Sequence, residues 1–160
     1  MFHVKHTTKK QKHMTEEQVK KAIRDIPDFP SKGILFKDLT TAFKEPSCMK
    51  WFENELYKRY KDKGITKIVG IESRGFVVAP ILGNRLNIGF VPMRKKGKLP
   101  AETVEISYSK EYGIDTIELH KDSLTTDDII LIHDDLLATG GTMIAACKLA
   151  KKYKKKKIYV

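Results

Sequence analysis

Runs of hydrophobic residues along the chain predict buried strands. Residues 67–71 and 129–132 are mainly aliphatic, and residues 88–93 form a similar apolar stretch. Such runs are typical of strands covered on both faces, as in parallel sheets. A last apolar fragment, residues 158–160, predicts one further strand segment.

Apolar residues at helical spacing predict helices between these strands. The helices are expected over residues 48–61, 76–86 and 142–153. Residues 103–108 and 115–120 alternate apolar and polar positions around a polar tip, which predicts a mobile hairpin. Strands that alternate with helices indicate an α/β fold with a doubly wound, mostly parallel, twisted sheet.

A separate helical signal stands near the N-terminus. Thr15-Glu16-Glu17-Gln18 has the pattern of a capping box, which predicts a helix start. Pro27 is expected to end this helix, since proline is poorly tolerated inside one. The predicted apolar stripe of the helix comprises Val19, Ala22, Ile23 and Ile26.

The positive charge of the chain is concentrated at its two ends. The formal net charge is +11, and the ten lysines within residues 1–13 and 151–160 account for all but one unit of it. Neither end contains an acidic residue, and the lysines are not interleaved with a regular array of aromatic residues. The ends are therefore predicted to be solvated, and a nucleic-acid surface is not expected.

Length and residue usage bound the remaining possibilities. Residues 1–13 are polar and lack periodicity, which predicts a disordered basic extension, whereas residues 14–160 are expected to form a single domain. No apolar run reaches membrane-spanning length, so no membrane association is expected. Cys48 and Cys147 match no metal-binding spacing and favour a reducing, cytoplasmic compartment.

The segment Ile129–Thr142 carries the strongest chemical signal. Asp134 and Asp135 follow a predicted strand, and a turn of small residues then leads into a predicted helix. Carboxylates in this place can accept hydrogen bonds from ribose hydroxyls, while loop N–H groups at a helix N-terminus bind phosphate. The alternative is an ordinary tight turn. The predicted phosphate loop comprises Ala138, Thr139, Gly140, Gly141 and Thr142.

Basic residues follow two other predicted strands at the same edge of the sheet. Arg74 could hold a pyrophosphate in a bidentate grip, although it could also be an ordinary surface residue. Four cations lie within five positions at Arg94, Lys95, Lys96 and Lys98. Such cations repel one another unless an anion joins them, so we expect this loop to face a pyrophosphate. A solvated loop is the alternative.

Taken together, these segments resemble the adenine phosphoribosyltransferases, a family with the type I phosphoribosyltransferase fold. The similarity spans about residues 23–152. The Ile129–Thr142 motif is shared by phosphoribosyltransferases in general. The other segments that carry the resemblance are Ile26-Pro27-Asp28-Phe29-Pro30, Gly33-Ile34-Leu35-Phe36-Lys37-Asp38, Glu72-Ser73-Arg74-Gly75-Phe76, Arg94-Lys95-Lys96-Gly97-Lys98-Leu99-Pro100 and Ser107-Tyr108-Ser109-Lys110-Glu111-Tyr112-Gly113. Of these, the Pro-Asp-Phe-Pro segment, the Arg-Lys-Lys-Gly-Lys-Leu-Pro loop and the Glu-Tyr-Gly tip are typical of the adenine enzymes.

The resemblance implies roles that the residues alone do not reveal. By their own context Phe36 is a core residue and Glu111 an ordinary loop carboxylate. The family implies that Phe36 stacks on adenine, with the Leu35 backbone and Lys37 at the edge of the base. It implies that Glu111, in the hairpin, handles a proton of adenine. It implies that Arg74 and Lys95 hold the pyrophosphate. It also implies a small N-terminal hood.

The implied reaction is purine salvage. Adenine and phosphoribosyl pyrophosphate give AMP and pyrophosphate, with Mg²⁺ carried on the donor and not bound directly by the protein. The resemblance further implies a homodimer in which the Arg94 loop approaches the partner's site. It also implies a longer C-terminal end, so the domain is expected to be incomplete after Val160.

Other interpretations remain open from the sequence. The chain could be a phosphoribosyltransferase for another base such as xanthine, although the Phe36 segment argues against that. It could be a non-catalytic phosphoribosyl-pyrophosphate-binding regulator or an inactive truncated remnant. His133 interrupts an apolar strand beside Asp134, and it is expected to be a core histidine more than a proton-handling group.

Overall fold

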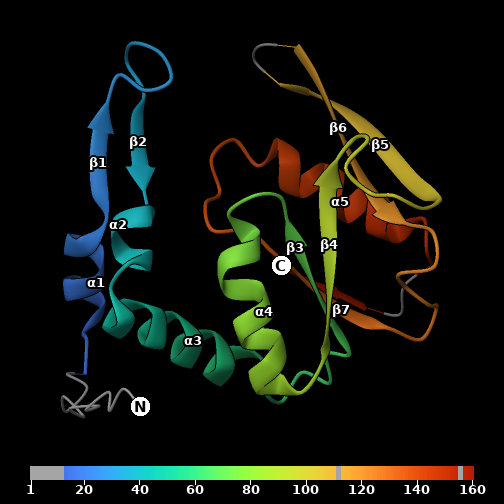
Figure 1. Cartoon of the computed structure of the whole chain (residues 1–160), viewed down its shortest axis with the longest axis horizontal. Coiled ribbons are helices and arrows are strands. Elements are labelled where there is room, and N and C mark those ends of the chain that lie inside the picture. Colours follow the sequence, from blue (N-terminus) through green and yellow to red (C-terminus); the bar gives the residue numbers. More distant parts are fainter. Residues whose placement is uncertain (1–12, 111–112, 155–156) are drawn as a thin grey trace, which may run out of the picture. The chain divides into compact units, whose positions relative to one another are not determined.

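Figure 1 shows the protein as a computed structural model. The described residues are 13–110, 113–154 and 157–160. The chain forms two compact units, Met1–Phe52 and Glu53–Val160. The predicted disordered extension, residues 1–13, lies outside the described residues except for His13.

The first helix of the N-terminal unit, α1, covers Glu16–Ala22. The Thr15 hydroxyl accepts a hydrogen bond from the Gln18 backbone at 3.3 Å, and the Gln18 side chain accepts one from the Thr15 backbone at 3.0 Å. This confirms the predicted capping box. The chain becomes extended at Ile23. The predictions that Ile26 continues the helical stripe and that Pro27 ends the helix were therefore wrong.

Ile26 belongs to a two-stranded antiparallel sheet. Strand β1, Arg24–Pro27, pairs with β2, Leu35–Asp38, and this places Ile26 opposite Phe36. The short apolar stripe fits a helix as well as a strand, so pairing with a partner several residues further on decides the outcome. Arg24 joins the same strands through an ion pair of 2.5 Å with Asp38.

Two further helices complete the described part of this unit. Helix α2 covers Thr40–Phe43, and α3 begins at Pro46 and ends at Tyr60 in the second unit. The prediction of a helix over residues 48–61 is thus confirmed with slightly different ends. The buried residues of the N-terminal unit's core are Val19, Ala42 and Cys48.

A six-stranded sheet forms the centre of the second unit. Its strand order is β5-β6-β4-β3-β7-β8. Strands β4, β3, β7 and β8 run parallel to one another, whereas β6 pairs antiparallel with both β4 and β5. This confirms the predicted α/β fold. The bounds are β3 Lys67–Ile71, β4 Gly89–Lys95, β5 Thr103–Lys110, β6 Gly113–His120, β7 Ile129–His133 and β8 Lys157–Tyr159.

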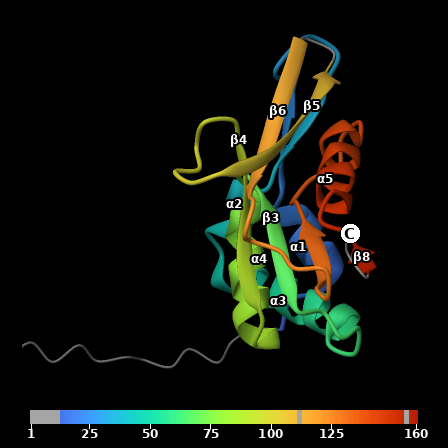
Figure 2. The same cartoon turned by 90° about the vertical axis from the view of Figure 1, so that its right-hand side faces the viewer.

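Helices cover both faces of the parallel strands. Figures 1 and 2 show α4, Gly75–Leu86, on one face and α5, Gly141–Lys151, on the other. Ile68 and Leu131 pack in a buried cluster with residues of α4. The opposite side chains of the same strands pack in a second cluster with α5; it includes Val69, Ile71, Ile130, Ile132, Ala146 and Leu149. Within the described part of the chain, no helix is long and apolar enough to cross a membrane.

The β5–β6 hairpin confirms the predicted hairpin, while its mobility stays a prediction. It joins the central strands through the register pairs Arg94↔Glu118 and Lys95↔Ile117. Helix α5 and the residues after it also hold the hairpin. The Lys152 ammonium donates to the Glu105 carbonyl at 2.7 Å, and the Tyr153 hydroxyl donates to the His120 carbonyl at 2.9 Å.

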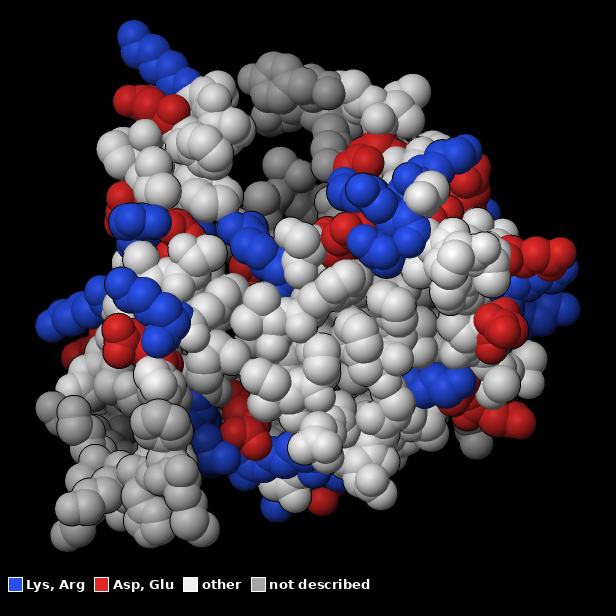
Figure 3. Space-filling model, in the orientation of Figure 1, with Lys and Arg blue, Asp and Glu red and all other residues white. Residues whose placement is uncertain are grey.

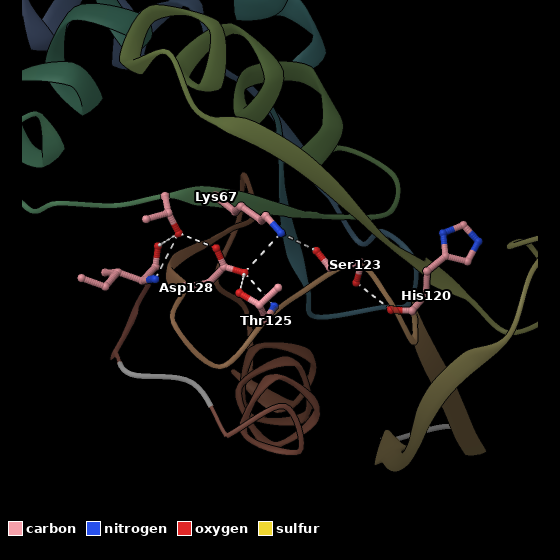
Figure 4. Close-up of polar contacts among 7 residues, drawn as sticks. Lys67, His120, Ser123, Thr125 and Asp128 are labelled. Atoms are coloured by element: carbon pink, nitrogen blue, oxygen red, sulfur yellow. Dashed lines mark hydrogen bonds and ion pairs between the residues drawn. The ribbon is translucent and has the colours of Figure 1, made fainter.

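A buried carboxylate ties together the starts of β3 and β7 (Figure 4). Asp128 accepts hydrogen bonds from the Thr66 hydroxyl and the Thr125 backbone, both at 2.7 Å. The Lys67 ammonium lies 3.2 Å from the same carboxylate and donates to the Ser123 carbonyl at 2.9 Å. Burial alone would raise the pKa of Asp128, but these hydrogen bonds outweigh it and lower the pKa to about 2.

Replacement of this carboxylate should lower stability. In Asp128→Ala the donors around the site lose their acceptor, and a buried unsatisfied group costs about 1–3 kcal/mol. We expect a decrease of that size in the free energy of unfolding, measured by urea denaturation at pH 7. Asp127→Ala, at an exposed neighbouring position, should leave the value nearly unchanged.

The same group fixes a pH dependence. Because the folded-state pKa is depressed, the contribution of Asp128 is present above its ordinary pKa near 4 and is lost as pH falls through about 2. The difference between the wild type and Asp128→Ala should therefore shrink between pH 4 and pH 2. A difference that stays constant over this window would contradict the assignment.

Candidate functional site

The segment that the resemblance assigned to the base lies in the β1–β2 hairpin of the N-terminal unit. The rings of Phe36 and Phe29 meet edge to face, with centroids 5.2 Å apart. Leu35 and Phe29 are each about half exposed, at 54% and 50%. Lys37 forms an ion pair of 2.6 Å with Asp25. The hairpin thus presents apolar surface beside backbone that lies at a sheet edge.

The predicted phosphate loop lies at the carboxyl end of β7 in the second unit. Gly140 has φ +81°, a conformation that glycine adopts without steric cost, and α5 begins directly after it. A close approach of two chain segments brings Arg74 to this loop. A Cβ atom on Gly75 would lie 2.7 Å from the His133 carbonyl oxygen, so only glycine allows the start of α4 to meet the end of β7.

The two acidic residues of the loop are linked to the basic residue that follows β3. Arg74 Nε lies 3.0 Å from Asp135 Oδ2, whose side chain is 3% exposed. Burial raises the pKa of Asp134 to about 6, helped by the neighbouring Asp135 charge, while Arg74 acts in the opposite direction. Burial likewise raises the pKa of Asp135 in spite of Arg74. The structure therefore brings together the three charged residues that sequence reasoning placed at one edge.

A small pocket opens over the loop. Its volume is about 110 Å³, and its walls are Asp134, residues 136–140, Thr142 and Met143. Typical pockets for whole ligands have roughly 300–1,000 Å³. The pocket is therefore of a size for one group of a ligand, such as a phosphate, with the N-terminus of α5 beside it. Of the predicted phosphate-loop residues, Gly141 alone does not line the pocket.

The basic segment from Arg94 to Lys98, whose first two residues end β4, is anchored by two carboxylates that sequence reasoning did not single out. Glu72 accepts hydrogen bonds from Arg94 Nη2 and from the Lys95 backbone, each at 3.0 Å. The Arg94 side chain holds the pKa of Glu72 below its ordinary value. The guanidinium of Arg94 is thus already engaged, and its Nη1 donates to the Lys98 carbonyl at 2.8 Å.

Glu118 is the second anchor. Its side chain accepts hydrogen bonds from the backbone of Lys98 and Leu99, both at 3.0 Å, although the residue is only 3% exposed. Burial opposes ionisation, but these backbone donors prevail and lower the pKa of Glu118. The sequence contained one signal for this role of Glu118, namely its position in a strand between two core residues, Ile117 and Leu119. A charged residue in such a place needs partners.

Of two further predicted residues, the structure describes only His133. Glu111 lies outside the described residues. His133 is largely buried at the end of β7, and its Nε2 atom has no hydrogen-bond partner. Burial lowers the pKa of His133 to about 4, so the ring is neutral near pH 7. Within the described ranges, no group of three or more His, Cys, Asp or Glu residues could hold a metal ion.

Comparison with known proteins agrees with this arrangement of strand, acidic pair and loop. Residues 45–160 match the family model of the phosphoribosyl transferase domain. The chain is 63% identical over 147 residues to the adenine phosphoribosyltransferase of Bacteroides thetaiotaomicron, covering 92% of this chain and 84% of that protein. The chain belongs to the adenine phosphoribosyltransferase family.

Solved structures of family members have the same fold. The enzyme from Giardia lamblia, complexed with 9-deazaadenine, is 44% identical, with a TM-score of 0.87 over 91% of this chain and 82% of that one. The enzyme from Saccharomyces cerevisiae, complexed with adenine and an imino-altritol bisphosphate, is 37% identical, with a TM-score of 0.82 over 90% and 83%. The predicted type I phosphoribosyltransferase fold is thereby confirmed.

The environment of His133 gives a measurable pH dependence. Its folded-state pKa of about 4 lies below the ordinary value of 6.5. The unfolded chain therefore binds more protons between these limits, so stability falls as pH is lowered from 6.5 to 4. His133→Leu should remove this part of the loss in urea denaturation measured across that range. The exposed His13→Asn serves as the control and should behave as the wild type.

Proposed function

We propose that the protein transfers the 5-phosphoribosyl group of phosphoribosyl pyrophosphate to adenine, giving AMP and pyrophosphate. The observation that carries this proposal is the loop after β7, where Asp134 and Asp135 precede a phosphate-sized pocket at the N-terminus of α5. The high identity to proteins named adenine phosphoribosyltransferase supports the choice of base.

The donor would bind across the loop and the basic edge of the sheet. Asp134 and Asp135 would accept hydrogen bonds from the ribose hydroxyls, while the 5-phosphate would occupy the pocket lined by residues 136–140 and Thr142. Arg74 and Lys95 would hold the pyrophosphate, with Lys98 nearby. Arg94 would act through the shape of its loop, since its guanidinium is bound to Glu72.

The same residues account for rate enhancement. Cleavage at the anomeric carbon builds oxocarbenium character, as in glycoside hydrolysis. Cations beside the departing pyrophosphate stabilise its developing charge. Closure of the β5–β6 hairpin would exclude water, which otherwise competes with adenine for the donor. Glu111, which lies between β5 and β6 in the sequence, would hold or accept the proton that adenine loses.

Adenine would bind to the β1–β2 hairpin. Phe36 would stack on the base, and the exposed apolar side chains of Leu35 and Phe29 extend that surface. Backbone groups of Leu35 would read the edge of the base. Lys37 would support this segment through its ion pair with Asp25.

Magnesium would arrive with the donor. Oxygen is the ligand that Mg²⁺ prefers, and the donor itself offers phosphate and ribose oxygens, so the ion would need no direct protein ligand. When bound, Mg²⁺ supplies neutralisation of the pyrophosphate charge.

A homodimer in the cytoplasm completes the proposal. Figure 3 shows that the face over α4 bears few charged side chains, and Ile81 in that helix is 38% exposed. An apolar face of this kind suits a second copy of the chain. Cys48 and Cys147 are free thiols, which accords with a reducing compartment.

The central test is AMP formation from adenine and phosphoribosyl pyrophosphate. We expect turnover with adenine and little with hypoxanthine, guanine or xanthine. Glu111→Ala should lower turnover by roughly 10²–10⁴-fold, because positioned acid–base groups contribute that much, with a smaller effect on substrate binding. Donor binding without turnover would instead favour a regulator or an inactive protein, and turnover mainly with xanthine would reassign the base.

The assignment of Asp134 to the ribose hydroxyls predicts that the KM for the donor depends on pH, with an acid limb in its pH profile. Since burial raises the pKa of Asp134 to about 6, its carboxylate becomes protonated as pH falls through that value. The KM for the donor should therefore rise below about pH 6. Asp134→Asn should raise that KM roughly 10- to 100-fold at pH 8, the equivalent of one charged hydrogen bond, and should flatten the limb.

The exposed Asp62→Asn is the matched control for charge and should keep the wild-type profile. If Asp134→Asn keeps the wild-type rise in the KM for the donor at acid pH, that rise comes from another group. An unchanged KM for the donor would contradict the ribose role.

A further inference from the structure

The cations at the end of β4 and directly after it are neutralised by carboxylates of the chain itself. Arg94 pairs with Glu72 at 3.0 Å, Lys96 pairs with Glu105 at 2.9 Å, and Lys95 forms an ion pair with Asp115. We expected these cations to repel one another until an anion binds. That expectation was wrong for Arg94, Lys95 and Lys96, which each have a carboxylate partner. A pyrophosphate that binds Lys95 has to compete with a carboxylate that is already there.

Asp115 differs from the other two carboxylates because its contacts lead to the phosphate loop. It lies opposite Tyr108 across the β5–β6 hairpin, and the Tyr108 hydroxyl donates to Asp115 Oδ2 at 3.3 Å. The same hydroxyl lies 3.1 Å from Thr142 Oγ1, in the first turn of α5. The backbone of Thr116 donates to Asp115 Oδ1 at 2.9 Å. A polar chain thus runs from Lys95 through Asp115 and Tyr108 to Thr142.

The other two pairs have different surroundings. Glu72 also binds the Lys95 backbone, so it is part of the loop's framework. Glu105 is 43% exposed at its side chain and its partner Lys96 is 64% exposed, so water screens that pair. The Lys95–Asp115 pair is more buried, at 36% and 22%.

We propose that Asp115 is a positioning residue. Its carboxylate is the partner of the Lys95 ammonium until the donor binds, and the pyrophosphate group then replaces it. This inference rests on the proposed function, because it assigns Lys95 to pyrophosphate. It adds that the β5–β6 hairpin and the phosphate loop are linked through Tyr108 and Thr142 while the donor is absent.

Asp115 has two effects on Lys95. In the free protein it offsets the repulsion between Lys95 and neighbouring cations. On binding, it competes with pyrophosphate for Lys95 and so lowers the affinity for pyrophosphate. Asp115→Asn keeps the shape of the side chain and its acceptor oxygen but removes the charge. Since an ion pair of this kind is worth about 0.2–1 kcal/mol, pyrophosphate should bind roughly 1.5- to 5-fold more tightly to this variant.

The test uses calorimetry on the full chain with three probes, each in the presence of Mg²⁺. Pyrophosphate and phosphoribosyl pyrophosphate should both bind more tightly to Asp115→Asn than to the wild type. Ribose 5-phosphate lacks the pyrophosphate and should bind equally to both. In the Lys95→Met background, Asp115→Asn should have no further effect on pyrophosphate, because the competed partner is gone.

Glu105→Gln is the matched control. It removes the same charge from a carboxylate paired with the adjacent lysine, but Glu105 has no contact with Tyr108 or Thr142 among the described interactions. Its affinity for pyrophosphate should stay at the wild-type value. The melting temperature of each variant is measured alongside. If Asp115→Asn is poorly folded, Asp115→Ser, which also removes the charge, takes its place with the same expected result.

Three results would overturn the inference. The first is weaker or unchanged pyrophosphate binding in a folded Asp115 variant. The second is an effect of Asp115→Asn that survives in Lys95→Met, and the third is an equal effect of Glu105→Gln. Failure of the proposed function looks different, since the wild type itself would then bind neither phosphoribosyl pyrophosphate nor pyrophosphate.

Discussion

Compensation of charge at the carboxyl edge of the sheet is the constraint on which the rest of the second unit depends. Charged side chains lie at the ends of β3, β4 and β7, where burial makes an unpaired charge costly. Arg74 with Asp135 joins the ends of β3 and β7, and Arg94 with Glu72 joins β3 and β4. The loops are thereby fixed before a ligand arrives.

This compensation is incomplete at the acidic pair. Asp134 and Asp135 lie side by side with one nearby guanidinium, and burial raises the pKa of both. Such an arrangement favours a ligand that donates hydrogen bonds to the two carboxylates, as vicinal hydroxyls do. The same edge therefore contains fully paired charges that serve the framework and under-compensated acids that suit binding.

Sequence patterns predicted the central elements because their signals are local. The aliphatic runs of β3 and β7 and the capping box of α1 are legible within a few residues. The β1–β2 hairpin was missed, since the stripe that includes Ile26 suits either a helix or a strand until its partner Phe36 is known. Pairing between distant segments is decided by the tertiary fold.

The candidate site was also predicted only in part. The loop residues 134–142 and Arg74 could be singled out because their residue types are unusual at the ends of buried strands. Glu72 and Glu118 did not, because their importance lies in hydrogen bonds to residues about twenty positions away. The roles proposed for Phe36 and Glu111 came from resemblance alone, since nothing in their immediate sequence distinguishes them from a core ring and a loop acid.

The manner in which the β5–β6 hairpin is attached has a consequence for how such proteins diversify. Two register pairs, Arg94↔Glu118 and Lys95↔Ile117, connect it to the parallel strands, and Tyr108 of its outer part also contacts Thr142 of α5. The outer strand pairs of the hairpin therefore add no register constraint to β3, β4 or β7, whereas Tyr108 connects them to the first turn of α5. Sequence changes in its described outer part would alter the contacts of Tyr108 and Asp115 and leave the pairing of the central strands unaltered.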